Sequence, residues 1–363
     1  MPREYILAIN PGSTSTKVAL YNGEEKVFSS KIEHPSIELD RYSSVIEQYD
    51  YRLNVIINWL REANVTTASL RATVGRGGLL RPMPAGTYLV TDAMINDLKD
   101  NIGGEHASNL GGILAKGIAD KEEIKAFIVD PVAVDEMNHI ARISGMPDIQ
   151  RRSQVHALNI KAVSHRYAHE HNKNLKDINL IVAHLGGGIS VAPIEKGLIT
   201  DVNNANEMGP LSPERSGGLP VGDLVKMCYS GKYTFNEIKA KLKGKGGLVS
   251  YLGTNNAKEV EERANNGDER AGLIFMVMAY QIAKEIGAMA AALCGKLDAI
   301  ILTGGLAYSK TLTDKIQSMT GFIAPVVLYP GEDELKALNE GALRVLEGEE
   351  AEKIYENEVI IND

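Results

Sequence analysis

The chain has 363 residues, more than one hydrophobic core usually serves, so two domains are expected. The net charge of −8 and the pI of about 5.6 argue against a nucleic-acid-binding surface. Cys228 and Cys294 lie far apart, without metal or redox spacing, which favours buried, reduced thiols in a cytoplasmic protein.

Apolar, β-branched runs alternate with helical patterns along the chain, and this alternation predicts an α/β fold. The N-terminal residues lead straight into a strand-like run, without a secretion signal. The apolar run 271–294 is interrupted by Gln281, Lys284 and Glu285, so it predicts a core helix rather than a membrane span. The expected strands are 5–10, 16–21, 26–32, 70–74 and 126–129, and the expected helices are 43–63, 108–121 and 160–171.

After Asn179 the strand pattern starts again, and two segments share one design. AINPGSTSTKVALYNGE and VAHLGGGISVAPIEKG each read as strand, polar or glycine bend, strand, turn and strand. The number of positions between Asn10 and Gly23 in the sequence equals that between His184 and Gly197. Two unrelated hairpins with glycine turns are the alternative. A duplication would allow the two hairpins to hold a phosphate chain between two domains.

The first bend is rich in groups that suit a phosphate. Gly12 lets an anion approach the backbone, while Ser13, Ser15 and Lys17 supply polar side chains. The Walker A pattern is absent, so this is not a P-loop. The alternative is a solvated hairpin turn.

Two further glycine clusters follow predicted strands. Gly186, Gly187 and Gly188 cost backbone entropy on folding, which is easiest to explain where a ligand approaches the main chain. Gly304 and Gly305 end a buried strand before a helix and suit a flat purine or a ribose. Three such junctions together favour a nucleotide.

Arginines stand beside glycines at two places, Arg76 in GRGG and Arg215 in ERSGG. A guanidinium there suits the oxygens of a carboxylate or a phosphate, with a loop ion pair as the alternative. Asp130 follows an apolar strand, where α/β sheets present side chains to ligands. Histidines in turn contexts are His106, in EHASN with Asn109, and His156, in VHALN.

The motifs INPGSTSTK, GRGG, EHASN, IVDP, VHALN, HLGGG, ERSGG and ILTGGLA occur in that order. In this series the chain resembles the acetate and butyrate kinases, which share a superfamily with sugar kinases, actin and chaperone ATPases. The resemblance runs from Ile6 to about Arg344 and is nearest to the butyrate kinases. It implies two duplicated ribonuclease-H-like (actin-like ATPase) domains with a nucleotide cleft between them. The N-terminal domain would span 1–133 plus 334–363, with a returning C-terminal helix, and the second, nucleotide-binding domain would span 134–333.

The resemblance also implies a reaction, the reversible transfer of a phosphoryl group between ATP and the carboxylate of a short-chain fatty acid such as butyrate or isobutyrate. ATP or ADP and Mg²⁺ would be required. A carboxylate is already a nucleophile, which favours direct in-line transfer. Catalytic positions would be Arg76, Asp130, His156 and Arg215; nucleotide positions Asn10, Ser13, Ser15, Lys17, His184, Gly186–Gly188 and Gly304–Gly305; substrate positions Val155, His106, Asn109 and Pro210; metal positions Asn10, Asp130 and Glu332.

Some of these assignments stay open. Arg71 could replace Arg76, and Asp333 or Glu334 could replace Glu332 in GEDEL. Val155 stands where acetate kinases carry an aromatic residue, which would leave room for a longer acyl chain.

An acetate or propionate kinase, a sugar kinase, and an actin-like or chaperone-like ATPase are the rival functions. We expect a cytoplasmic homodimer or larger homo-oligomer without nucleic-acid or membrane partners.

Overall fold

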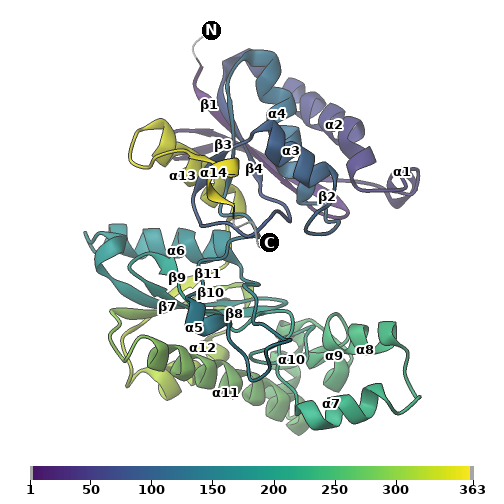
Figure 1. Ribbon diagram of the computed structural model, residues 1–363, viewed down its shortest axis with the longest axis vertical. Helices are drawn as coiled ribbons and strands as arrows, with labels where there is room; N and C mark the ends of the chain where they lie inside the picture. Colours follow the sequence, from purple (N-terminus) through teal and green to yellow (C-terminus); the bar gives the residue numbers. More distant parts are fainter. Residues whose placement is uncertain (1–2, 360–363) are drawn as a thin grey trace. The chain divides into compact units, whose positions relative to one another are not determined.

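The computed structural model describes residues 3–359, which form two compact α/β units (Figure 1). The first unit comprises Met1–Asp135 and Asp333–Asp363, so it is built from both ends of the chain. The second unit is the continuous segment Glu136–Glu332. Each unit has its own sheet and its own hydrophobic core.

The sheet of the first unit begins with an antiparallel hairpin and continues with parallel strands. β1 pairs antiparallel with β2 and parallel with β4, and β4 pairs parallel with β6. Its strand order within the described residues is β12-β5-β6-β4-β1-β2-β3. The bounds are β1 Tyr5–Pro11, β2 Ser15–Asn22, β3 Glu25–Glu33, β4 Leu70–Arg76, β5 Thr87–Leu89, β6 Lys125–Val129 and β12 Lys353–Ile354.

The sheet of the second unit repeats this arrangement with five strands among the described residues, in the order β11-β10-β7-β8-β9. β7 and β8 form the hairpin, β10 is parallel to β7, and β11 is parallel to β10. The series β9-β8-β7-β10-β11 therefore matches β3-β2-β1-β4-β6, and the predicted duplication is confirmed. The bounds are β7 Asn179–Leu185, β8 Ile189–Glu195, β9 Leu198–Ile199, β10 Ala299–Gly304 and β11 Val326–Pro330.

Apolar helix faces cover the first sheet. α2 places Leu53, Ile56 and Leu60 in the core, and α4 packs on β4 and β6. α13 packs on β1, β4 and β6. The helices are α1 Ser36–Leu39, α2 Tyr49–Glu62, α3 Asp92–Lys99, α4 Asn109–Glu122, α13 Glu334–Leu346 and α14 Tyr355–Glu358, with 3₁₀ turns η1 Ile46–Gln48 and η2 Thr67–Ser69.

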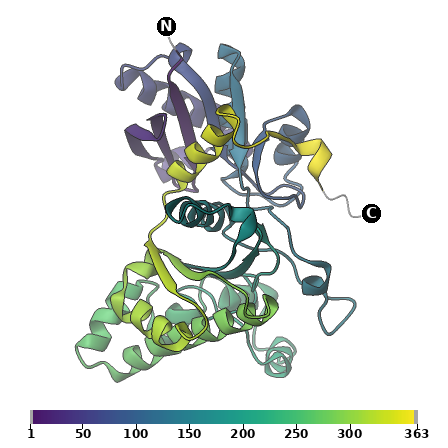
Figure 2. The same cartoon turned by 90° about the vertical axis from the view of Figure 1, so that its left-hand side faces the viewer.

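The second sheet lies between α6 on one face and α11 with α12 on the other (Figure 2). α11 is long and apolar enough to cross a membrane by length and composition, yet Phe275, Met278, Ile282 and Ile286 are buried in the core of this unit. The helices are α5 His139–Arg142, α6 Ala157–Glu170, α7 Val221–Cys228, α8 Phe235–Leu242, α9 Gly247–Leu252, α10 Ala257–Asn265, α11 Glu269–Ala292 and α12 Lys310–Thr320, with η3 Leu175–Asp177 and η4 Gly305–Tyr308.

The strands expected in the first half are present, each within two residues of its expected ends. The helix expected over 43–63 starts later, with η1 at Ile46 and α2 at Tyr49. Ser43 instead donates from its backbone and its hydroxyl to Glu47, a local turn that competes with the helix.

Two glycines bring α4 against the end of β4. A Cβ on Gly75 would lie 2.1 Å from the carbonyl oxygen of Gly111, and a Cβ on Gly111 would lie 2.2 Å from that of Arg76. Helix and strand backbones therefore touch directly, and this contact sets the position of Arg76.

We predict that Gly111→Ala destabilises the protein by at least about 1–3 kcal/mol, because the new methyl group meets rigid backbone. Gly287→Ala in α11 is the matched control, since a Cβ there meets nothing within 4 Å and the substitution should be neutral or stabilising. Urea unfolding of both variants measures the difference. Equal stability of the two variants would contradict this account of the contact.

Candidate active site

Three predicted residues lie at neighbouring strand ends in the first unit. Asn10 lies near the end of β1, Arg76 ends β4, and Asp130 follows β6. These strands are parallel neighbours, and their registers pair Ile9 with Gly75 and Arg76 with Val129. The three side chains therefore belong to the carboxyl edge of one sheet, the usual ligand side of an α/β fold.

The Glu334 carboxylate joins this edge to α13. Asn10 Nδ2 donates to Glu334 Oε2, and Arg76 Nη1 forms an ion pair with Glu334 Oε1. Lys17 Nζ lies 3.8 Å from the same carboxylate. Asp333 caps α13 by accepting from the Lys336 backbone at 3.0 Å. The start of α13 thus gathers Asn10, Lys17 and Arg76 around one acidic side chain.

The alternative candidates lie in other surroundings than Glu334 and Arg76. They are the two acidic neighbours of Glu334 and the arginine at the start of β4. Glu332 belongs to the second unit, where its Oε2 lies 3.6 Å from His184 Nε2. Asp333 pairs with Lys26 at 2.8 Å. Arg71, at the opposite end of β4 from Arg76, donates to the Leu346 carbonyl at 3.2 Å. Geometry favours Glu334 and Arg76 for a role at the sheet edge.

Asp130 is buried and has a positive φ of 39°. Such a backbone angle is uncommon for a residue with a side chain and stores local strain. Two hydrogen bonds to Gly86 hold it: Asp130 Oδ1 accepts from the Gly86 N–H at 2.8 Å, and the Asp130 N–H donates to the Gly86 carbonyl at 3.0 Å. The loop before β5 therefore fixes this carboxylate at the strand end.

The first bend connects β1 to β2, with Ser13 exposed and Ser15 half-buried. A residue that the sequence reasoning missed lies beneath it. Arg52 of α2 is 1% exposed and donates to the carbonyls of Gly12 and Ser13, at 2.9 and 3.1 Å. The periodicity of α2 signals this, because Arg52 lies four residues before Ile56 on the buried face.

His34 extends this buried network. Thr16 Oγ1 accepts from Arg52 at 3.1 Å and lies 2.8 Å from His34 Nε2. His34 Nδ1 lies 3.3 Å from Tyr51 Oη. Burial, together with the neighbouring Arg52 charge, lowers the pKa of His34 to about 4. The imidazole is therefore neutral at pH 7.

Two histidines stack in the second unit. His184 lies in β7 beside Thr303 of β10, and its ring lies 4.0 Å from the ring of His156, with 15° between the ring planes. His184 Nδ1 lies 2.9 Å from Asn159 Oδ1, and His156 Nδ1 lies 2.8 Å from Ser190 Oγ. Groups on α6 and β8 thus orient both rings.

The second bend is shaped by an arginine. A Cβ on Gly188 would lie 1.9 Å from Arg215 Nη1, whereas Gly187 is exposed and a Cβ there would have only the Glu214 side chain within 4 Å. At Gly188, the group that approaches the main chain is therefore Arg215. Arg215 Nη1 also donates to the Ala205 carbonyl at 2.6 Å, and burial lowers the pKa of the guanidinium, which still remains charged at pH 7.

The third glycine cluster closes the end of β10. Gly304 has a φ of +87°, and a Cβ there would lie 2.4 Å from the Leu185 carbonyl oxygen. Gly304 exchanges two backbone hydrogen bonds with Gly331, at 2.9 and 3.1 Å. Gly305 is exposed, with open space where a Cβ would be. Of the two, Gly304 is required by packing and Gly305 leaves room for a ligand.

The predicted substrate residues are divided between the two units. Val155 and Pro210 are buried in the second unit, and His106 is exposed in the first unit. Asn109 is 1% exposed; its Oδ1 accepts from Leu79, and its Nδ2 donates to Asn101 and Gly104. This amide ties the loop at Leu79 to the loop 101–104 and has a structural role.

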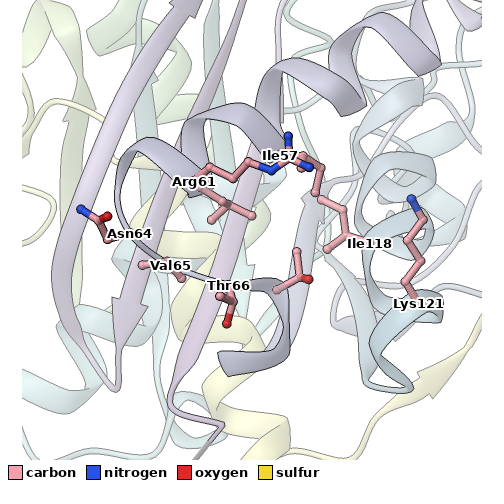
Figure 3. A pocket seen from close by; sticks show the side chains of 9 residues that line it. Ile57, Arg61, Asn64, Val65, Thr66, Ile118 and Lys121 are labelled. Carbon is pink, nitrogen blue, oxygen red and sulfur yellow. The ribbon is translucent and has the colours of Figure 1, made fainter. Parts of the chain in front are cut away.

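A hollow of about 530 Å³ lies elsewhere in the first unit, where α2 and η2 meet α4 (Figure 3). Ile57, Leu60 and Ile118 contribute apolar walls, with Arg61 and Lys121 at its edge. None of the predicted site residues lines it.

Known proteins resemble this chain along almost its whole length. The model of the acetokinase family matches residues 148–320. "Probable butyrate kinase 2" of Caldanaerobacter subterraneus subsp. tengcongensis is 59% identical over 96% of this chain and 99% of its own. "Butyrate kinase 2" of Clostridium acetobutylicum is 53% identical over the same shares. The chain belongs to the acetokinase family. The residues matched by the family model include His156, His184 and Arg215, all in the second unit.

Solved structures of acetokinase-family enzymes share the fold. Porphyromonas gingivalis acetate kinase superposes with a TM-score of 0.76 and 20% identity, covering 94% of this chain and 100% of its own. A propionate kinase from Francisella tularensis gives a TM-score of 0.74 at 19% identity, covering 93% and 98%. The predicted actin-like fold is confirmed by these likenesses.

The low pKa of His34 predicts a pH-dependent stability. The unfolded chain binds the proton more tightly, since its histidine titrates near 6.5, so stability falls as pH drops from about 6.5 towards 4. This costs about 2 kcal/mol at pH 5. The charged groups nearby are Arg52 and Glu33, and Tyr51 contacts the ring.

Urea unfolding at pH 7.5 and pH 5 measures this dependence. His34→Gln should lose less stability than the parent protein between the two pH values, whatever its stability at pH 7.5. Identical losses would show that His34 does not cause the effect.

Proposed function

We propose that this protein transfers the γ-phosphoryl group of ATP reversibly to the carboxylate of a short-chain fatty acid, butyrate or isobutyrate, giving an acyl phosphate and ADP. The observation that carries the proposal is the 52–59% identity, over 96% of the chain, to relatives named as butyrate kinases. The polar groups at the carboxyl edges of both sheets support it, because this is where a nucleotide is expected to bind.

The chemistry requires neutralisation of negative charge, because a carboxylate and a phosphoryl group repel each other. We assign this role to the guanidinium groups of Arg76 and Arg215, whose planar forks suit phosphate oxygens. His156, oriented by Ser190, would hold the phosphoryl group during direct in-line transfer. We assign phosphate contacts to the two bends and an adenosine contact to Gly305.

The residues at the edge of the first sheet fit Mg²⁺. Among residues 3–359, no three His, Cys, Asp or Glu side chains gather into a cage. Mg²⁺ takes one or two protein oxygens and completes its shell with phosphates and water. Glu334 and Asn10 offer such oxygens, with Asp130 at the next strand end. Bound there, Mg²⁺ would neutralise charge on the nucleotide phosphates. We therefore propose Glu334 in place of Glu332 as the acidic ligand.

Two variants test whether Glu334 or Glu332 is the acidic ligand. Glu334→Gln should lower kcat/KM by at least about 10²-fold and raise the Mg²⁺ concentration needed for half-maximal rate, because it removes charge beside Asn10 and Arg76. Glu332→Gln is the matched control and should leave the Mg²⁺ dependence unchanged. A Mg²⁺ dependence that shifts in Glu332→Gln alone would restore the first assignment.

The function itself is tested with a panel of C2 to C6 acids, following ADP and acyl phosphate formation. We expect kcat/KM for butyrate or isobutyrate to exceed that for acetate by at least about tenfold, since a hydrophobic pocket gains about 1–3 kcal/mol per methylene. If Val155 borders the acyl chain, Val155→Phe should depress butyrate turnover more than acetate turnover. Preference for acetate or propionate would support those family members, and ATP hydrolysis without any acid would support an ATPase.

We also propose a cytoplasmic homo-oligomer without nucleic-acid or membrane partners. α7 has none of its residues buried and exposes Val221 and Val225, while Tyr229 and Phe235 nearby are 89% and 79% exposed. Contact between copies of the chain would cover these apolar side chains.

A further inference from the structure

The carbonyl groups of the bend between β1 and β2 accept hydrogen bonds from buried donors of the first unit. Arg52 Nη1 donates to the Gly12 carbonyl at 2.9 Å and, more weakly, to that of Ser15 at 3.4 Å. Arg52 Nη2 donates to the Ser13 carbonyl at 3.1 Å, and the His34 N–H donates to that of Thr14 at 2.8 Å. Every carbonyl from Gly12 to Ser15 is thus occupied by a donor of the first unit.

The N–H groups of the same bend have fewer hydrogen-bond partners than its carbonyl groups. Gly12 N–H closes the hairpin on the Ser15 carbonyl at 2.7 Å. The N–H groups of Ser13 and Thr14, which lie outside the strands, donate to no backbone acceptor within residues 3–359. Successive N–H groups without acceptors form a concave site that attracts an anion, as in phosphate-binding nests. The exposure of Ser13 and Thr14 leaves this site open to a ligand.

We infer that Arg52 is a positioning residue, which binds the carbonyl side of the bend and thereby keeps the backbone N–H groups of Ser13 and Thr14 available for a phosphate of the nucleotide. The identity of the anion rests on the proposed function. Arg52 itself is buried and does not touch the ligand; it acts through the backbone of Gly12–Ser15.

An arginine is needed because of its number of donors and its shape. Arg52 Nε and Nη2 both donate to Gln48 Oε1, at 3.0 and 2.8 Å, which fixes the plane of the guanidinium against α2. The remaining donors reach the bend carbonyls and Thr16 Oγ1. Lysine offers three donors on one point and cannot reproduce this fork.

Arg52 also carries a positive charge beneath the bend. Its hydrogen-bond acceptors within the described residues are all neutral oxygens, from carbonyls, an amide and a hydroxyl. Burial lowers its pKa to about 10, so the group remains charged at neutral pH. A buried charge that no carboxylate neutralises attracts an anion at the surface above it more strongly than an exposed lysine does.

Calorimetry with ATP, inorganic pyrophosphate and adenosine tests the inference. Arg52→Met should weaken ATP and pyrophosphate binding at least tenfold and leave adenosine binding unchanged. Arg52→Lys should lose less, because it keeps the charge while losing part of the fork. In turnover, the KM for ATP should rise in both variants while the KM for the acid stays constant.

Thr73→Val is the matched control, since it removes a buried hydrogen bond of the same unit, from Thr73 Oγ1 to the Ala115 carbonyl at 2.8 Å, away from the bend. It should lower stability without changing ATP affinity. Hydrogen exchange on the parent protein needs no variant: the amides of Ser13 and Thr14 should exchange fast and become protected by ATP.

Unchanged ATP affinity in Arg52→Met, or equal weakening of ATP and adenosine binding, would overturn the inference, as would slow exchange of the Ser13 and Thr14 amides without ligand. These experiments distinguish a failure of the proposed function from a failure of the role proposed for Arg52. ATP binding that depends on Arg52 without transfer to any acid would refute the proposed function alone. Acid-dependent turnover with normal ATP binding in Arg52→Met would refute only the role of Arg52.

Discussion

The central constraint in each unit is the position of the strand that carries the bend. β1 and β7 each have an antiparallel hairpin partner on one side and a parallel neighbour on the other. The hairpin places a bend at the carboxyl end of the strand, and the parallel neighbours add their own carboxyl ends to the same edge. Polar side chains from distant parts of the sequence are therefore collected without any long loop, once by each sheet.

Much of this arrangement follows from the sequence. Apolar, β-branched runs locate the strands, and the repeated hairpin with its constant spacing indicates the duplication. The sequence could not show which of three adjacent acidic side chains reaches the edge of the first sheet. Glu332, Asp333 and Glu334 are adjacent acids, and the start of α13 decides their surroundings: Asp333 caps the helix, and Glu334 in its first turn contacts Asn10.

Other site assignments depended on contacts that no local pattern reveals. Asn109 is an amide in a turn context, and only the fold shows that its hydrogen bonds are used between loops. Gly188 is a glycine because Arg215 lies against it, twenty-seven residues along the chain. Arg52 is the opposite case. The buried face of α2 is readable from its period, and a charged residue on that face is a signal that the sequence itself contains.

The first unit is assembled from both ends of the chain, and this has a consequence for biosynthesis. Asn10 and Glu334 are 324 positions apart, so the carboxylate beside the first bend is added only after the whole second unit has been translated. The second unit is a continuous segment and leaves the ribosome before α13 does. A chain that lacks residues 334–363 therefore holds a finished second unit and an incomplete first one, in which the sheet face at β1, β4 and β6 is not covered by α13.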